Sequence, residues 1–185
     1  MGLRKANSYS KKKVVPYTRK SKKKSKAFIK AVPPQSIVKF TMGNETAFNQ
    51  GKCPFIIRML ADENVQIRSN ALEAARQYVN RKLEDTFPNQ YLYKVKPYPH
   101  HIQRENKMLT GAGADRMQTG MQLSFGKPIA RAAILRKGEL IFFIASQTPK
   151  VDKLARELLH RIKAKLPCKV KFIYQNLTVQ AEENE

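Results

Sequence analysis

The chain has few cysteines and no long apolar run, and each shortage excludes a class of protein. Cys53 and Cys168 are the only cysteines among 185 residues, too few for a disulfide framework or a four-ligand zinc site. We expect both to be reduced, buried thiols. The most apolar run, residues 140–145, is six residues long, whereas a membrane span needs roughly 20. The basic N-terminus lacks a following apolar signal core, so we expect a cytoplasmic protein without a membrane partner.

Acidic side chains are absent from residues 1–30, which contain twelve lysines and arginines. The whole chain has 36 Lys and Arg against 14 Asp and Glu, a formal charge of +22, so the remainder is basic as well. A self-repelling segment with little to bury should be disordered in isolation and should order when phosphates neutralise it. The charge therefore predicts a polyanionic partner, while 42% hydrophobic residues suffice for a folded core.

Hydrophobic patterning beyond the arm predicts strands mixed with two helices. An apolar stripe that follows Asn64 and includes Ile67 predicts a helix ending near residues 85–88. Thr148 as N-cap and Pro149 at the first helical position predict a second helix, which Pro167 stops. Strands are expected at residues 37–42, 55–60, 91–95, 101–103, 121–125, 130–135, 140–145 and 169–174, with turns at 43–51, 126–128 and 137–138. Because strands and helices do not alternate regularly, the class is α+β with a mixed or antiparallel sheet.

Residues 107–120 match neither period and predict a long loop between strands. The segment contains three of the eight glycines, Gly111, Gly113 and Gly120. Loops longer than about 12 residues are usually functional or disordered. A glycine-bearing, nearly acid-free segment can approach a crowded polyanion without steric or charge penalty, and we expect it to be disordered without that partner.

The sequence lacks the motifs that are typical of nucleotide binding, metal binding and acid/base catalysis. Spacing around Gly120 and Gly126 fails the P-loop pattern, and the glycines near residue 111 fail the dinucleotide pattern. His100 and His101 are adjacent, so in an extended chain they face opposite ways and do not bind one metal easily. Asp115 beside Arg116 is the one acid/base candidate, but the loop has no second carboxylate. The sequence predicts no catalytic residue, metal or cofactor.

Nucleic-acid binding is the function that the charge favours. Signatures of the RRM, KH and zinc-finger modules are missing, so the prediction rests on phosphate neutralisation, whose salt slope is roughly 0.7 to 0.9 per phosphate. Charged helix faces can merely solubilise a protein, but that does not explain twelve cations without an acid. The predicted arm contacts are Lys11, Lys12, Lys13, Arg19, Lys20, Lys22, Lys23 and Lys24.

Three runs carry a resemblance to a known family. Residues 101–109 (HIQRENKML), 113–121 (GADRMQTGM) and 125–128 (FGKP) are similar to the archaeal and eukaryotic large-subunit ribosomal proteins numbered sixteen in the universal scheme, ten-e in the older naming. Residues 71–76 (ALEAAR) and 5–17 fit as well, and the resemblance covers most of residues 1–175. Gly111 stands where many eukaryotic relatives carry Cys.

The resemblance implies a ribosomal role. It implies a compact sandwich of the hammerhead type, wedged among RNA helices of the large subunit in the cytoplasmic ribosome and joining late in assembly. Implied partners are large-subunit rRNA and tRNA, with 5S RNA and neighbouring ribosomal proteins, and no small-molecule substrate. Arg104, Lys107 and Arg116 would contact RNA backbone. The loop would face tRNA near the peptidyl transferase centre through Thr110, Gly111, Ala112, Gly113, Ala114, Asp115, Arg116, Met117, Gln118 and Thr119.

The chain thus divides into a basic RNA-binding arm (1–33), an α+β ribosomal protein domain (34–176) with the loop 107–120, and an acidic tail (177–185). Alternatives stay open. A basic chromatin protein that binds DNA or RNA, or an RNA-maturation factor, would share the arm without needing the loop. An RNA-processing enzyme would need an acid/base pair, for which Asp115 is the only starting point.

Overall fold

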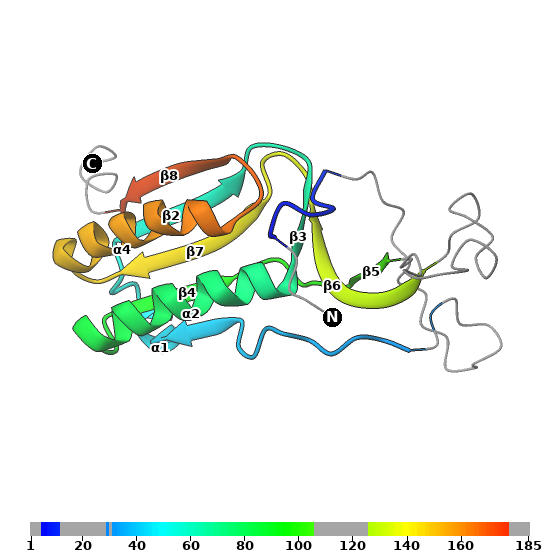
Figure 1. Cartoon of the computed structure of the whole chain (residues 1–185). Helices are drawn as coiled ribbons and strands as arrows, with labels where there is room; N and C mark the ends of the chain where they lie inside the picture. The colour runs from blue at the N-terminus through cyan, green and yellow to red at the C-terminus, as the bar shows by residue number, and fades with distance from the viewer. Residues whose placement is uncertain (1–4, 12–28, 30, 106–125, 178–185) are drawn as a thin grey trace, which may run out of the picture.

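Helices cover one face of an antiparallel sheet, and a second, smaller sheet extends from one end (Figure 1). The computed structural model describes residues 5–11, 29, 31–105 and 126–177. The larger sheet has the order β1-β4-β7-β2-β8, and each neighbouring pair is antiparallel. Its strands are β1 (Thr41–Gly43), β2 (Phe55–Ala61), β4 (Tyr91–Val95), β7 (Leu140–Ser146) and β8 (Val170–Asn176).

The main core lies between this sheet and two helices, α2 (Ser69–Thr86) and α4 (Pro149–Ile162). Alternate residues of the central strands, such as Ile57 on β2 and Phe142 on β7, point at the helices and are fully buried. The helices contribute apolar residues at spacings of three and four, among them Leu158 and Ile162 of α4. This arrangement is a two-layer sandwich and confirms the α+β class predicted from the sequence.

The smaller sheet consists of β3 (Val65–Arg68), β6 (Lys127–Leu135) and β5 (His101–Glu105), in the order β3-β6-β5 and antiparallel throughout. One face of it joins the main core through Val65, Ile67, Ala133 and Leu135. The other face carries polar side chains, which are described below. Figure 1 shows this sheet at the end of the molecule away from the C-terminal tip of β8.

Two sequence predictions at strand and turn boundaries are wrong. Residues 65–68, predicted as the start of the first helix, form strand β3, because Val65 and Ile67 are β-branched and pair with β6. The helix begins only at Ser69. Residues 127 and 128 were expected in a turn, but they open β6 and pair with β5. The strand predicted at 121–125 lies outside the described residues.

Other departures concern local hydrogen bonding. Of the strand predicted at 37–42, only Thr41 and Met42 lie in β1; Ile37 is buried and Val38 exposed, as in extended chain. The predicted turn 43–51 contains a third, short helix α1 (Glu45–Asn49), because the Asn44 side chain accepts a hydrogen bond from Ala47 N at 2.9 Å. The α4 segment ends at Ile162 and continues as the 3₁₀ helix η2 (Lys163–Lys165).

The other strands predicted within the described residues, and the start of the second helix, agree with the structure. β2, β4, β5, β7 and β8 occupy the predicted segments to within a few residues, and α4 begins at Pro149 after Thr148. Both cysteines are free thiols, as expected, but only Cys53 is buried; Cys168 is half-buried, which differs from the prediction. Among the helices that the structure describes, none has the length and apolar composition to cross a bilayer.

Candidate RNA-binding surface

The outer face of the three-stranded sheet is polar yet buried. Gln66 and Arg68 of β3 and His101 and Gln103 of β5 point to this face, because the register pairs Arg68 with Ala132 and Ala132 with His101. Each of the four is at most 7% exposed. Burial lowers the pKa of His101 below its ordinary value, and the nearby charges of His100 and Arg104 act in the same direction. The face therefore favours a neutral imidazole and needs a polar cover.

Residues 5–11 of the basic arm supply part of that cover. Gln66 donates through its backbone N to Ser10 O at 3.0 Å and through its side-chain amide to Tyr9 O. The Tyr9 hydroxyl donates to Glu105 Oε1 at 3.0 Å, which ties the arm to the last residue of β5. Residues 5–11 therefore differ from the expectation of an arm with nothing to contact: they form a turn that is hydrogen-bonded to the sheet.

The far end of the arm is attached to the same sheet. Arg131 in the central strand β6 donates through Nε to Pro33 O at 2.7 Å, and its Nη1 lies 3.4 Å from Gln35 Oε1. The cationic stretch between residues 11 and 33 therefore leaves from this sheet and returns to it. Residues 12–28 and 30 themselves lie outside the described part.

The ends of the predicted loop also start from this sheet. Glu105, the last residue of β5, pairs with Lys127, the first residue of β6. Residues 106–125 are not described, so the predicted contacts Lys107 and Arg116, and the tRNA-facing residues 110–119, fall outside the structure, as do Lys12, Lys13, Arg19, Lys20, Lys22, Lys23 and Lys24. Among the described residues, Glu105 and Lys127, which lie on either side of the segment 106–125, belong to the same sheet that residues 9, 10 and 33 contact.

Two predicted RNA contacts are described. The Lys11 side chain is 78% exposed, and its Nζ is 3.9 Å from Glu63 Oε2, a distance at which an exposed pair contributes little. Arg104 is half-buried within β5, one residue before the residue that Tyr9 contacts. Both therefore lie at the three-stranded sheet, although they belong to distant parts of the chain.

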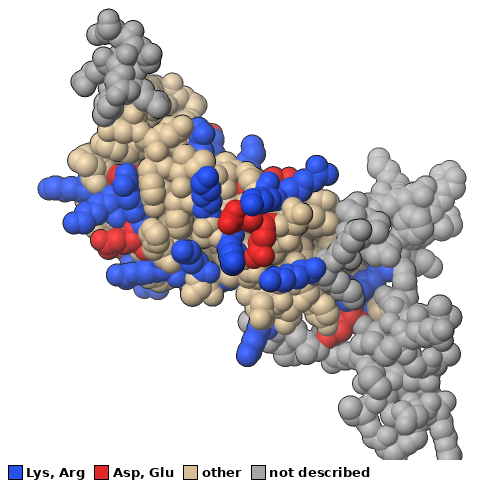
Figure 2. Space-filling view, turned by 90° about the horizontal axis from the view of Figure 1, so that it is seen from above, with Lys and Arg blue, Asp and Glu red and all other residues tan. Residues whose placement is uncertain are grey.

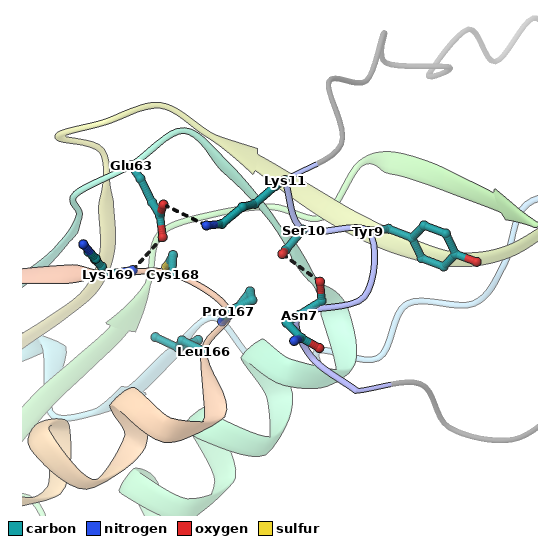
Figure 3. Close-up of a pocket in the computed structure, with 9 residues that line it drawn as sticks. All are labelled: Asn7, Tyr9, Ser10, Lys11, Glu63, Leu166, Pro167, Cys168 and Lys169. Atoms are coloured by element: carbon teal, nitrogen blue, oxygen red, sulfur yellow. Dashed lines mark hydrogen bonds and ion pairs between the residues drawn. The ribbon is translucent and has the colours of Figure 1, made fainter.

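An open cavity of about 640 Å³ lies beside the arm (Figure 3). Glu63 spans one wall: its Oε1 accepts from Lys169 N at 2.9 Å, while its other oxygen faces Lys11. The ring of Tyr9 points away from the cavity. Burial, followed by the charge of Glu63, raises the pKa of Cys168 to about 11, so this residue is a neutral thiol at pH 7 rather than a nucleophile. The lining comprises Asn7, Tyr9, Ser10, Lys11, Glu63, Leu166, Pro167, Cys168 and Lys169.

Basic side chains are spread over the described surface in the view of Figure 2, whereas acidic side chains gather in only a few places. From Lys127 to Leu177 the chain has twelve Lys and Arg against three acidic residues. Within the described ranges, no group of three or more His, Cys, Asp and Glu side chains could hold a metal ion. The excess of cations favours charge pairing and hydrogen bonding with a polyanion at this surface.

Sequence reasoning missed two groupings. The first is the hydrogen bond from the Gln66 side-chain amide to Tyr9 O, which joins residues 57 positions apart. Only the fold brings these two residues together. The second grouping lies between α4 and β8, where Arg156 and His160 contact Tyr174 and Phe172. Its signals were visible separately, as a polar stripe on a helix and alternate aromatic residues in a strand, but their contact depends on how α4 crosses the sheet.

Comparison with known proteins finds relatives that cover most of the chain. The family model described as ribosomal protein L16p/L10e matches residues 13–173. A relative from Hyperthermus butylicus, named large ribosomal subunit protein uL16, is 43% identical over 153 residues, which is 82% of this chain and 79% of that protein. The protein of the same name from Staphylothermus marinus is 40% identical and covers 96% of each chain. That from Sulfolobus acidocaldarius is 39% identical and covers 98% of each.

The match takes in both sheets and both long helices, and includes the two strands that flank the predicted loop. Because it extends over nearly the full length at this level of identity, the likeness is not confined to a shared motif. The chain belongs to the ribosomal protein L16p/L10e family.

Proposed function

We propose that this protein is a structural constituent of the large ribosomal subunit, acts in the cytoplasm during translation, and binds large-subunit rRNA. Relatives covering almost the whole chain carry the name of a large-subunit protein. The formal charge of +22 supports an RNA partner, since cations that neutralise phosphates release counterions and so drive association.

One geometric observation carries the more specific part of the proposal. Tyr9 contacts Glu105, Arg131 contacts Pro33, and Glu105 pairs with Lys127. The arm and the segment 107–120 are therefore both rooted on the three-stranded sheet. We infer that the arm binds rRNA while the loop, held close by, helps to position tRNA near the peptidyl transferase centre.

The proposed contribution to peptide transfer is positional and not enzymatic. An ordered scaffold that holds RNA helices and tRNA in place lowers the entropic cost of bringing reactants together. Neighbouring ribosomal proteins and 5S RNA are the further partners proposed for the same surface. Arg104, Lys107 and Arg116 would contact RNA backbone at the base of the loop and within it.

Deletion of residues 110–119 tests the role of the loop. Eleven residues would still connect Glu105 to Lys127, which are paired neighbours, so we expect the fold to persist. We expect impaired translation or late subunit maturation, measured as a fall in polysomes and an accumulation of immature large subunits.

A matched variant replaces residues 110–119 with ten alternating Gly and Ser residues, which keeps the length but removes the native side chains, such as those of Arg116 and Met117. It should reproduce the defect if side chains contact tRNA. Normal growth and polysomes in the deletion strain would refute the role of the loop, although they would leave rRNA binding by the arm untouched.

A further inference from the structure

A group of aromatic and cationic side chains lies on the edge strand β8, outside the surface discussed above. Phe172 and Tyr174 alternate in this strand and therefore share a face, with ring centroids 6.2 Å apart and planes only 18° from parallel. Arg156, His160 and Lys163 reach over them from α4 and η2, at helix spacings of four and three that form one stripe. We call these five residues the α4–β8 platform.

Contacts within the platform hold the rings and cations in register. The Arg156 guanidinium carbon lies 4.3 Å from the centroid of the Tyr174 ring, and the His160 ring lies 4.6 Å from that of Phe172. Lys163 Nζ is 5.7 Å from the Phe172 centroid. Asp152, itself largely buried, fixes the guanidinium through Arg156 Nη2 at 2.7 Å. The Arg156 guanidinium is thus held over the face of the Tyr174 ring in a cation–π contact, with Asp152 fixing its position.

The need to bury apolar side chains does not explain why the five platform residues lie together. Phe172 packs against the core, but Tyr174 is 40% exposed and the Arg156 side chain 45% exposed. Among the described strands, β8 lies at the edge of the larger sheet and pairs with β2 alone, so the platform faces outward at the margin of the sheet. An exposed stacked pair of an aromatic ring and a guanidinium offers a flat surface to which a further planar group can be added.

The local charge selects the kind of planar group. Residues 149–176, which include α4 and β8, have eight cations and two acids; Asp152 pairs with Arg156, and Glu157 lies on the same helix. Nucleic-acid bases stack on aromatic rings and guanidinium planes, and the adjoining phosphates favour cations such as Lys163. A planar base joined to a phosphate fits both features.

We propose that the α4–β8 platform binds an unpaired nucleotide of ribosomal RNA, with its base stacked at Tyr174 and Arg156 and its phosphate near Lys163. This inference rests on the proposed rRNA-binding function and adds to it a second contact. In Figure 1 the C-terminal end of β8 lies at the opposite end of the molecule from the paired ends of β5 and β6. The protein would thus contact rRNA over α4 and β8 of the larger sheet as well as at the three-stranded sheet.

The test measures binding of the full chain to a large-subunit rRNA transcript at fixed salt. Tyr174→Leu keeps an apolar side chain but removes the ring, and should weaken binding about tenfold. Tyr174→Phe keeps the ring and should bind as the wild type does. Arg156→Lys keeps the charge but loses the planar stack, so it should weaken binding severalfold with an unchanged salt slope.

Tyr98 provides the matched control. It is 52% exposed and stacks on Phe40 at 5.7 Å, beside the other edge strand, β1. Tyr98→Leu should leave affinity unchanged, and thermal unfolding of each variant separates lost binding from lost folding. Equal affinities for Tyr174→Leu, Arg156→Lys and the wild type would overturn the platform while rRNA binding stands. A wild-type chain that does not bind the transcript would overturn both.

Ultraviolet crosslinking of purified large subunits supplies a readout that does not depend on a variant. We expect a nucleotide adduct on a peptide that contains Phe172 and Tyr174. Chemical crosslinks from this peptide to another ribosomal protein, in place of a nucleotide adduct, would contradict the proposal by assigning the platform to a protein partner.

Discussion

His101 illustrates how a single buried side chain reports on the three-stranded sheet. It is 1% exposed on a face that also carries the buried polar side chains of Gln66, Arg68 and Gln103, and burial lowers its pKa. A group with a lowered pKa stays neutral in the folded chain at a pH where the unfolded chain already binds a proton. Its contribution to stability is complete above the ordinary value near 6.5 and is lost as the pH falls through the folded value.

The free energy of unfolding should therefore decrease as the pH is lowered from 7 to 5. His101→Gln, which cannot titrate, should flatten this dependence, measured by urea denaturation at a series of pH values. Acid destabilisation below about pH 4.5 should persist in both proteins, because the hydrogen bond from Arg76 lowers the pKa of Glu73. An equally steep decrease in the variant between pH 7 and 5 would rule out His101 as its source.

Elements differ in how far their sequences determine them. α4 was predicted closely because Thr148, Pro149 and a stripe of apolar residues all indicate the same helix start. Residues 65–68 were misassigned because Ile67 suits both a helical stripe and a strand, and only pairing with β6 decides between them. Local patterns predict an element well when a single interpretation satisfies them.

The candidate site was predictable in part for the same reason. The arm and loop have unusual compositions that need no partner to be noticed. Two other features depend on contacts between distant segments. They are the hydrogen bond between Gln66 and Tyr9 and the contact of Arg156 with Tyr174 in the α4–β8 platform. Neither polar residues in a strand nor aromatic residues on an edge are unusual, so the sequence had no signal that would join them.

Gly43 shows how one element fits against another. Its φ of +84° is in the left-handed region, and an added Cβ would lie 2.1 Å from the Tyr91 carbonyl oxygen of β4. Gly43→Ala should lower the free energy of unfolding by about 1 to 2 kcal/mol for the backbone conformation and by about 1 to 3 kcal/mol more for the clash. Chemical denaturation measures both.

Gly138→Ala is the control for this prediction. Its φ is +87°, but nothing lies within 4 Å of the added Cβ, so only the conformational cost should appear. Equal losses in the two variants would mean that the close approach between β1 and β4 does not constrain the fold.

The whole molecule carries a large positive charge. Tyr9 and Pro33, which lie in the described parts of the basic arm, both contact the three-stranded sheet. Lys11, Lys12, Lys13, Lys22, Lys23 and Lys24 are proposed to neutralise phosphates. Their replacement with Gln should weaken binding to large-subunit rRNA and reduce the salt slope by up to about 4 to 5, at roughly 0.7 to 0.9 per phosphate. Lys→Arg at the same six positions keeps the charge and should keep the slope. A slope unchanged by Gln would place the phosphate contacts elsewhere.

Co-sedimentation with large ribosomal subunits after a high-salt wash tests the central claim most directly. Cell extract is washed, centrifuged through a sucrose gradient and probed for the full chain, with and without ribonuclease. We predict that the protein remains with the large subunit after the wash and is released when the RNA is digested. A chain that sediments alone, away from ribosomes and indifferent to ribonuclease, would contradict the account.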